Sequence, residues 1–297
     1  DHRLAQRIYR SLMAKGPGTY LVEVETCDGE RFVFSGKTQV RILIGRSAPE
    51  TRITENARPL QNHSYVEYST FAPRRITATL QILGEDAAHM WKYRQDMYRI
   101  FNPLKGPFTL RLTHLHRGVT YTAYNVLLAD AMDSPLDTKV EPRYSKYALT
   151  FIAYYPFWYG ASNTLEIGSL SGSPGAASST LTVTDGNYWA SPRVQFIGPL
   201  TNPVLSNTIY KGIPPKKLEL LGTVPALHYV MVDTRLKTVT SSFTPQITLK
   251  HDSNLNTFGL IPRALGAAGA NRLSLSATGY TSASKVVLTW DDTYYAI

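Results

Sequence analysis

The stretch that decides the fold is Tyr154-Tyr155-Pro156-Phe157-Trp158-Tyr159-Gly160, in which six of the seven residues are aromatic or proline. Aromatic side chains stabilise a fold through burial, and Pro156 lacks the N–H that a β-ladder needs, so a strand is expected to end here. The segment that follows, 161–179, is rich in Ser, Gly and Ala, buries little surface and is predicted to be a linker. The sequence therefore predicts two β domains, 1–160 and 180–297.

Length and composition agree with a two-domain protein. The chain has 297 residues, enough for two domains that each bury a core. Its single cysteine, Cys27, cannot form an internal disulfide, which fits synthesis in a reducing cytoplasm, and it is predicted to be a half-buried residue at a strand end. No run approaches the roughly 18 consecutive apolar residues of a membrane helix, and no signal-peptide pattern opens the chain. Membrane insertion is therefore not expected.

The net charge of +9 attracts nucleic acid or acidic protein surfaces. The basic residues are, however, scattered as single residues and pairs such as Arg74-Arg75. The chain has no Lys/Arg run and no basic motif interleaved with aromatic residues, which binders of single-stranded nucleic acid use. Sequence-specific recognition of nucleic acid is therefore not expected.

The first domain is predicted to be β-rich with one internal helix. Apolar residues recur every three or four positions over residues 85–101, and Asn102-Pro103 ends the pattern. Met90 and Met97 belong to this stripe, and Trp91 and Tyr98 are expected to widen it. A short basic helix is predicted over residues 2–15, packed on its own domain or docked on a neighbouring subunit, and the polar stretch 46–62 as a long loop or an extended hairpin.

A hairpin is predicted around Asp28-Gly29, because these residues suit the two positive-φ positions of a type I′ turn. Counting back from a two-residue turn pairs Val24 with Val33, which places both side chains on one face of the hairpin.

Candidate chemistry is sparse. His114-Leu115-His116 places two imidazoles on one face of a strand, a possible metal half-site that lacks a third ligand by spacing. Asp291-Asp292 alternates between faces, so the pair cannot converge as acid and base. No Gly-x-Ser-x-Gly elbow and no glycine-rich phosphate loop is present. Neither catalysis nor a metal or other cofactor is expected.

The second domain is predicted to be a β-sandwich or barrel, because it shows many short strand patterns at roughly 8–12-residue spacing with turn residues between them, among them strands over residues 193–197 and 238–241. Asp233-Thr234-Arg235-Leu236 is predicted to be the tight turn of a hairpin. Nothing in the pattern indicates a parallel sheet.

In their joint order, these features resemble the distal tail proteins of long-tailed bacteriophages. The resemblance covers the chain from about Arg74 onward, although the Pro-Gly pair of the family is missing around 266–269. The motifs of the first domain that carry it are Arg75-Ile76-Thr77, Phe101-Asn102-Pro103, Tyr121 and Tyr155-Pro156-Phe157-Trp158-Tyr159. The motifs of the second are Gly186-Asn187, residues 191–199, Thr201-Asn202-Pro203, Val232-Asp233-Thr234, residues 265–273 and the strand from Val286 to Trp290.

The resemblance implies a mainly β protein with an N-terminal ring-forming domain, which has one helix, and a C-terminal galectin-like β-sandwich. It also implies a structural role in the virion tail tip: a homo-hexameric ring that joins the tail tube protein to the tail hub and receptor-binding proteins. The channel of such a ring passes the tape measure protein and then DNA. Within this picture Arg46, Arg52 and Arg58 are candidate contacts with a neighbouring subunit or the lumen, and an ordinary surface loop is an equally simple interpretation of them.

Two other functions stay open at this point. In the first, the C-terminal domain binds host-surface carbohydrate, with Trp189 and Tyr294 as candidate aromatic platforms for sugar stacking. In the second, the chain is a cell-wall hydrolase, for which the sequence offers no catalytic residue.

Overall fold

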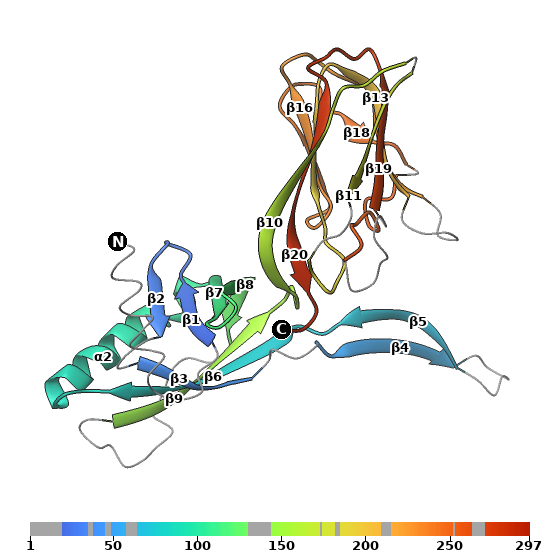
Figure 1. Ribbon diagram of the computed structural model, residues 1–297. Helices are drawn as coiled ribbons and strands as arrows, with labels where there is room; N and C mark the ends of the chain where they lie inside the picture. Colours follow the sequence, from blue (N-terminus) through green and yellow to red (C-terminus); the bar gives the residue numbers. More distant parts are fainter. Residues whose placement is uncertain are drawn as a thin grey trace. The chain divides into compact units, whose positions relative to one another are not determined.

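The computed structural model describes residues 20–34, 38–44, 49–57, 64–129, 144–172, 174–181, 185–208, 215–251, 253–262 and 271–297. The chain forms two compact units (Figure 1). Unit 1 comprises Asp1–Tyr159 and Tyr295–Ile297, and unit 2 comprises Gly160–Tyr294. The last three residues thus return to the unit in which the chain began, and each unit is described by itself below.

Unit 1 is built on one antiparallel sheet. Its strands lie in the order β2-β1-β7-β8-β9-β6-β3, and the start of β10 (Trp158–Ile167) pairs with β8 through Tyr159 and Thr122. A separate two-stranded ribbon is formed by β4 (Thr51–Ala57) and β5 (Ser64–Phe71). The strand bounds are β1 Tyr20–Glu25, β2 Arg31–Phe34, β3 Thr38–Ile44, β6 Arg74–Leu83, β7 Phe108–His114, β8 Val119–Leu128 and β9 Tyr144–Ala153.

The β1–β2 hairpin forms as predicted, but its predicted register is wrong by one residue. Val24 pairs with Phe32, and Glu23 pairs with Val33. Thr26 and Glu30 close a three-residue loop in which Gly29 takes the left-handed conformation, with φ +83°. The extra loop residue moves Val33 to the exposed face, because a shift of one residue reverses the face of every side chain.

Helix α2 (Ala87–Ile100) begins at the N-cap Asp86, whose carboxylate accepts a hydrogen bond from the His89 N–H at 2.8 Å. Met90 and Met97 are buried as predicted, whereas Trp91 and Tyr98 are exposed. Phe101, which follows the helix, packs against aromatic rings of the sheet and closes the core of unit 1. These rings belong to Phe32, Phe34, Phe108 and Phe151, with centroids 5.8–6.4 Å from that of Phe101.

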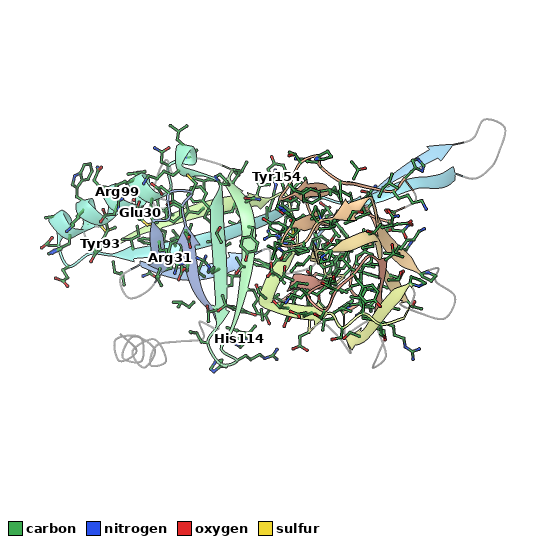
Figure 2. The ribbon with its side chains drawn as sticks, turned by 90° about the horizontal axis from the view of Figure 1, so that it is seen from above. Glu30, Arg31, Tyr93, Arg99, His114 and Tyr154 are labelled. Carbon is green, nitrogen blue, oxygen red and sulfur yellow. The ribbon has the colours of Figure 1, made fainter. Side chains whose placement is uncertain are left out.

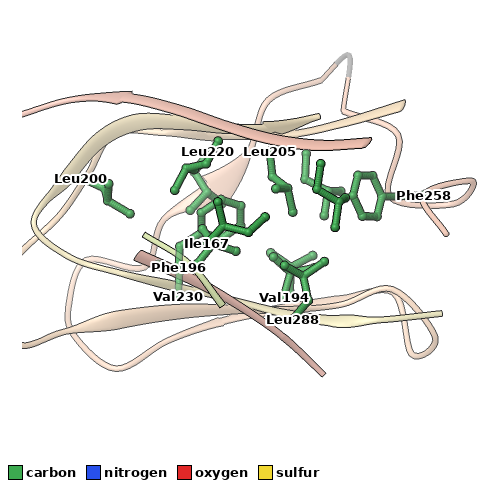
Figure 3. Packing of buried hydrophobic residues seen from close by; sticks show 14 of the residues in the cluster. Ile167, Val194, Phe196, Leu200, Leu205, Leu220, Val230, Phe258 and Leu288 are labelled. Carbon is green, nitrogen blue, oxygen red and sulfur yellow. The ribbon is translucent and has the colours of Figure 1, made fainter. Parts of the chain in front are cut away.

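Unit 2 is a sandwich of two antiparallel sheets. One has the order β17-β16-β12-β20-β10, and the other has the order β11-β19-β13-β14-β18, with β15 beside β13. Figure 3 shows the buried side chains between the two layers, among them Phe196, Leu205 and Leu288. The strand bounds are β11 Gly175–Leu181, β12 Arg193–Ile197, β13 Leu200–Thr208, β14 Lys216–Leu221, β15 Thr223–Val224, β16 Tyr229–Asp233, β17 Thr238–Ser241, β18 Thr248–Leu249, β19 Asn271–Thr278 and β20 Lys285–Tyr294.

The linker predicted over residues 161–179 is wrong. Most of it lies in β10 and in β11, and β11 pairs with β19 in an unbroken register from Gly175 with Ala277 to Leu181 with Asn271. Strand pairing uses main-chain groups that every residue other than proline carries, so a segment of small side chains forms an edge strand. The predicted start of the second domain at residue 180 therefore falls inside unit 2.

The mainly β fold class, with an internal α-helix and a C-terminal sandwich, is confirmed. The predicted N-terminal helix, residues 2–15, lies outside the described residues. Of the two alternatives for residues 46–62, the extended hairpin agrees with the β4–β5 ribbon. Cys27, predicted to be half-buried, is exposed in the hairpin loop. Helix α2 is too short and too polar to cross a membrane, and no other described helix meets the requirement.

Candidate functional site

A buried arginine organises the aromatic-proline stretch. Arg74 is the first residue of β6, and the residue is only 4% exposed. Its Nε donates to the carbonyl of Pro156 at 2.7 Å, and a terminal nitrogen donates to the carbonyl of Tyr295 at 2.8 Å. The guanidinium carbon lies 5.7 Å from the centre of the Trp158 ring, within the range of a cation–π interaction.

The electrostatics of Arg74 follow from its burial. Loss of solvation lowers the pKa of Arg74 to about 10, because burial disfavours the charged form. At neutral pH the side chain therefore stays charged, and it donates charge-assisted hydrogen bonds to both carbonyls.

Aromatic rings extend this site, which we call the junction cluster: Phe71, Arg74, Pro156–Trp158 and Tyr295. The Phe71 ring, at the end of β5, meets Phe157 edge-on at 5.5 Å and Tyr295 at 5.5 Å. The cluster therefore joins the base of the β4–β5 ribbon, the start of β10 and the C-terminal residues within unit 1. The cluster acts as a structural latch, because the Arg74 side chain holds two segments together through their main-chain carbonyls.

The aromatic-proline stretch is only partly buried. Trp158 and Tyr159 lie in the core, whereas Tyr154 is 59% exposed and Tyr155 is 37% exposed; the Tyr154 side chain is labelled in Figure 2.

A second feature of unit 1 is two groups of ion pairs, one around Glu30 next to β2 and one between β1 and β7. Arg99 of α2 and Lys105 both bond to Glu30, and the Lys105 bond is 2.9 Å long; Arg99 and Glu30 are labelled in Figure 2. Arg111 of β7 bonds to Glu23 at 2.9 Å and to Glu25. The cations Lys105 and Arg99 hold the pKa of Glu30 below its ordinary value, and Arg111 does the same for Glu25.

A third feature is the uncovered face of α2. Trp91 is 62% exposed and Tyr98 38% exposed, and the spacing of seven residues places both on one side of the helix. Large exposed aromatic residues are enriched at protein interfaces. The sequence assigned them to the core, because a periodicity that includes every apolar residue cannot separate the inner from the outer face.

The structure brings none of the three predicted arginines into a described contact. Arg52 lies in β4, with its side chain outside the described part, and Arg46 and Arg58 lie outside the described residues. Their proposed subunit or lumen contacts stay a prediction.

The two candidate sugar platforms are half-buried in unit 2. The Trp189 ring lies against Gly259, and the Tyr294 ring lies so close to Gly160 that an added Cβ would be 2.7 Å from it. Each ring therefore rests partly on main chain of its own unit. Carbohydrate binding through these residues likewise stays a prediction.

The other candidates carry structural roles. His114 accepts a hydrogen bond from the Arg117 N–H at 3.3 Å and meets Tyr20 edge-on, and its ring centre is 6.0 Å from that of His116. Among the described residues, no group of three His, Cys, Asp or Glu side chains could hold a metal ion. Burial raises the pKa of Asp292, which accepts from the Asp185 N–H at 3.2 Å.

The sequence contains a signal for the buried position of Arg74. Residues 74, 76, 78, 80 and 82 form the buried face of β6, and Arg74 is the only charged residue in that phase. A charge in the apolar phase of a strand indicates a buried partner.

Comparison with known proteins finds a family model that matches part of unit 1. Residues 35–153 match the model of a family described as phage tail protein RIFT-related domain. The match ends at the last residue of β9 and contains most strands of the unit 1 sheet together with α2. None of the curated proteins matches the chain.

One solved structure shares the fold over both units. The Dit (gp 19.1) protein of phage SPP1, described as a paradigm of the hub adsorption apparatus in phages that infect Gram-positive bacteria, superposes with a TM-score of 0.60. The alignment covers 92% of this chain and 98% of that chain at 11% sequence identity. A chain of the phage P2 baseplate in its Ca-activated conformation matches with a TM-score of 0.47 over 94% and 99% of the two chains, at 11% identity. The fold shared with SPP1 Dit agrees with the resemblance to distal tail proteins drawn from the sequence motifs.

Proposed function

We propose that this chain has a structural function in the tail tip of a bacteriophage. Its residues 35–153 match the phage tail protein RIFT-related domain, and its fold resembles that of the distal tail protein SPP1 Dit. The chain forms a homo-hexameric ring through unit 1. The ring joins the tail tube protein to the tail hub and the receptor-binding proteins, and its channel passes the tape measure protein and DNA.

The observation that carries the proposal is that the family match of residues 35–153 and the fold similarity over the whole chain both point to phage tail proteins. The family match falls on unit 1, and the fold similarity to SPP1 Dit extends over 92% of the chain, so that unit 2 is included. The architecture of a distal tail protein thus accounts for both units.

Unit 1 offers the two different surfaces that a ring requires. A ring is closed by a heterologous contact, in which one patch of each subunit meets another patch of the next. Among the described strands, β2 pairs only with β1 and β3 only with β6, so both ends of the sheet present main-chain groups that can pair. The exposed aromatic face of α2, with Trp91 and Tyr98, is the side-chain patch that such a contact would bury.

The function rests on assembly and requires no catalysis. The features described above are a latch of arginine and carbonyl groups, two groups of surface ion pairs and an exposed aromatic face, all of which position or join protein surfaces. No reaction is assigned to the chain, and its location in the proposal is the virion tail tip.

The mass of the particle in solution tests the ring. A hexamer of six 33.1-kDa chains has a mass of about 199 kDa, which light scattering after size-exclusion chromatography distinguishes from smaller assemblies. Negative-stain images of the same fraction are expected to show six-fold rings with an open centre. Acrylamide quenching of tryptophan fluorescence is expected to fall on assembly, because Trp91 is the most exposed tryptophan.

A matched pair of variants locates the ring contact. Trp91→Asp is expected to shift the mass toward the monomer, whereas Leu236→Asp, which changes an exposed side chain of unit 2, leaves the mass unchanged. A monomer at every concentration, with Trp91→Asp indistinguishable from the parent chain, would contradict ring formation through this face.

A further inference from the structure

Unit 1 is built from two stretches of chain that lie far apart in the sequence. One stretch is residues 1–159 and the other is residues 295–297, with the whole of unit 2 between them. In the order of the sequence, unit 2 is therefore an insertion in unit 1. We call residues 295–297 the strap, because the chain returns through them to unit 1 after it has passed through unit 2.

The strap has specific partners in unit 1. A terminal nitrogen of Arg74 donates to the Tyr295 carbonyl at 2.8 Å, and the Tyr295 ring meets Phe71 at 5.5 Å. All three strap residues are half-buried. Arg74 and Phe71 also contact Pro156 and Phe157, which belong to the first stretch. The strap thus supplies one carbonyl partner of a buried charge and one wall of the aromatic packing around it.

The buried charge makes the strap important for the sheet of unit 1. Arg74 is only 4% exposed, and a buried cation that loses a hydrogen-bond partner is strongly destabilising. Arg74 begins β6, which pairs with β9 from Ala153 onward and with β3 through Thr77 and Ile44. β3 is one of the two sheet ends assigned above to the ring contact. Loss of the strap is therefore expected to loosen the start of β6 and, through it, the β3 end of the sheet.

The fold of unit 2 determines where the strap lies. β10 and β20, through which the chain enters and leaves this unit, are neighbours in one sheet. The Tyr294 ring lies so close to Gly160 that a Cβ added to the glycine would be 2.7 Å from it. Folding of unit 2 thus brings its own entry and exit together, and Tyr295 follows directly after the exit.

An unfolded unit 2 would leave the strap on a long, flexible tether. The probability that the ends of a flexible chain meet falls with the 3/2 power of its length, which for a segment as long as unit 2 is a factor on the order of a thousand. Unit 2 can fold before the strap is in place, because its core between the two sheets consists of its own residues, among them Phe196, Leu205 and Leu288. The order in which unit 2 folds first and the strap then docks is therefore the favoured one.

We propose that the strap makes ring assembly conditional on the folding of unit 2, because unit 1 becomes competent to assemble only when folded unit 2 delivers Tyr295 to Arg74. The proposal rests on the proposed ring function and adds a control over it. A subunit whose unit 2 is unfolded keeps a loosened β6 and is excluded from the ring. Without such a control, one defective unit 2 would be built into every ring that its subunit joins.

Urea titration of the full chain tests this dependence. Gly198→Ala destabilises unit 2 selectively, because the added Cβ would lie 2.1 Å from the Pro225 carbonyl oxygen. Hydrogen exchange followed by mass spectrometry reports on unit 2 through β19 and on the junction cluster through residues 154–159, and light scattering reports the mass. We expect unfolding of β19, at least about tenfold faster exchange at 154–159 and loss of the hexamer to occur at one urea concentration, which is lower in Gly198→Ala than in the parent chain.

Two further variants separate the strap from the overall stability of the chain. Gly168→Ala, whose Cβ would have no contact closer than 3.4 Å, is expected to lose the hexamer at the same urea concentration as the parent chain. An insertion of about 20 Gly and Ser residues between Tyr294 and Tyr295 keeps both units but lowers the local concentration of the strap about 100-fold. This insertion is expected to speed exchange at 154–159 and weaken the hexamer while β19 stays protected.

The proposal is overturned if the hexamer and the protection at 154–159 persist at a urea concentration at which β19 has lost its protection. It is also overturned if the insertion variant assembles as the parent chain does. A parent chain that forms no hexamer contradicts the ring function instead, and exchange at 154–159 then tests the strap alone. In that case, loss of protection together with β19 supports the dependence of unit 1 on unit 2, and loss at an unrelated urea concentration refutes it.

Discussion

Substitution of Arg74 by methionine is expected to loosen the junction cluster while unit 2 stays folded. The variant leaves the buried carbonyl of Pro156 and the partly buried carbonyl of Tyr295 without their donor, at a cost of about 1–3 kcal/mol for each acceptor. Loss of the contact with the Trp158 ring adds about 1 kcal/mol. Methionine fills much of the vacated volume and adds no charge.

Removal of the buried charge partly offsets this loss. The pKa of Arg74 is lowered to about 10, and at 1.36 kcal/mol per unit this corresponds to about 3 kcal/mol of lost solvation. The difference leaves Arg74→Met destabilised locally by about 2 kcal/mol. Arg74→Lys, which keeps a donor but not the planar fork, is expected to lose about half as much.

Hydrogen exchange followed by mass spectrometry reads this effect locally. A change of about 2 kcal/mol in local opening corresponds to about 30-fold faster exchange. The faster exchange is expected in peptides that cover 154–159 and 294–297, and not in a peptide that covers β12. Acceleration of less than about threefold, or equal acceleration in β12, would refute the latch.

A truncation at residue 294 provides the matched control, because it removes the Tyr295 carbonyl that Arg74 binds. If the latch is correct, Arg74→Met in the truncated chain should add less destabilisation than in the full chain, since the two changes remove a shared interaction. Additive effects would show that the two groups act independently.

Three further predictions concern charge and packing. Lys105 and Arg99 lower the pKa of Glu30, so the Glu30 carboxylate contributes stability above pH 4.5 that is lost as the pH falls through the folded-state pKa; Glu30→Gln should flatten this acid-side fall of Tm. Burial raises the pKa of Asp292, so its ionised form costs stability above that pKa; Asp292→Asn should raise the Tm of unit 2 at pH 7 by about 2–4 °C, with the gain disappearing below about pH 4. Gly175→Ala should destabilise unit 2 by about 1–3 kcal/mol in urea titrations, because its Cβ would lie 2.1 Å from the Tyr280 ring; Gly168→Ala, whose Cβ would have no contact closer than 3.4 Å, should change stability by less than about 0.5 kcal/mol, and two silent substitutions would show that Gly175 does not pack as described.

Strands with a strict alternation and clear turn residues could be predicted with their bounds. β12 (Arg193–Ile197) and β17 (Thr238–Ser241) begin and end at the predicted residues. In both cases the signal is local, because the strand residues and the flanking turn lie within ten residues of each other. The existence of α2 was predictable for the same reason, and its ends shifted by only one or two residues.

β13 (Leu200–Thr208) was not predicted over most of its length, because Thr201-Asn202-Pro203 has the residues of a break. The structure accommodates them in a bulge between Thr201 and Val204. Asn202 takes φ +45°, and its main chain and side chain both bond to Gly222 at 2.8 Å. A bulge leaves one residue of the strand without a ladder hydrogen bond, so a proline is tolerated there. The residue that holds this bulge, Gly222, lies twenty residues further along the chain than Asn202.

The junction cluster illustrates the same limit. The sequence marked the aromatic-proline stretch as decisive, yet Arg74 donates to Pro156 across 82 residues and to Tyr295 across 221. Local pattern can show that a charge lies in an apolar phase, as it does at Arg74. It cannot name two carbonyl partners, because every residue offers the same acceptor.

The small-residue segment shows why composition alone misplaced the boundary between the units. A prediction from side chains measures how much apolar surface a segment can bury, and residues 161–179 can bury little. β11 is held in place by its main-chain hydrogen bonds to β19 and by an aromatic ring from another segment. Tyr280 lies directly over Gly175, and its hydroxyl donates to the Gly172 carbonyl at 2.8 Å. The Tyr280 ring can pack here only because Gly175 has no side chain, so at this edge strand the small residue is required for packing.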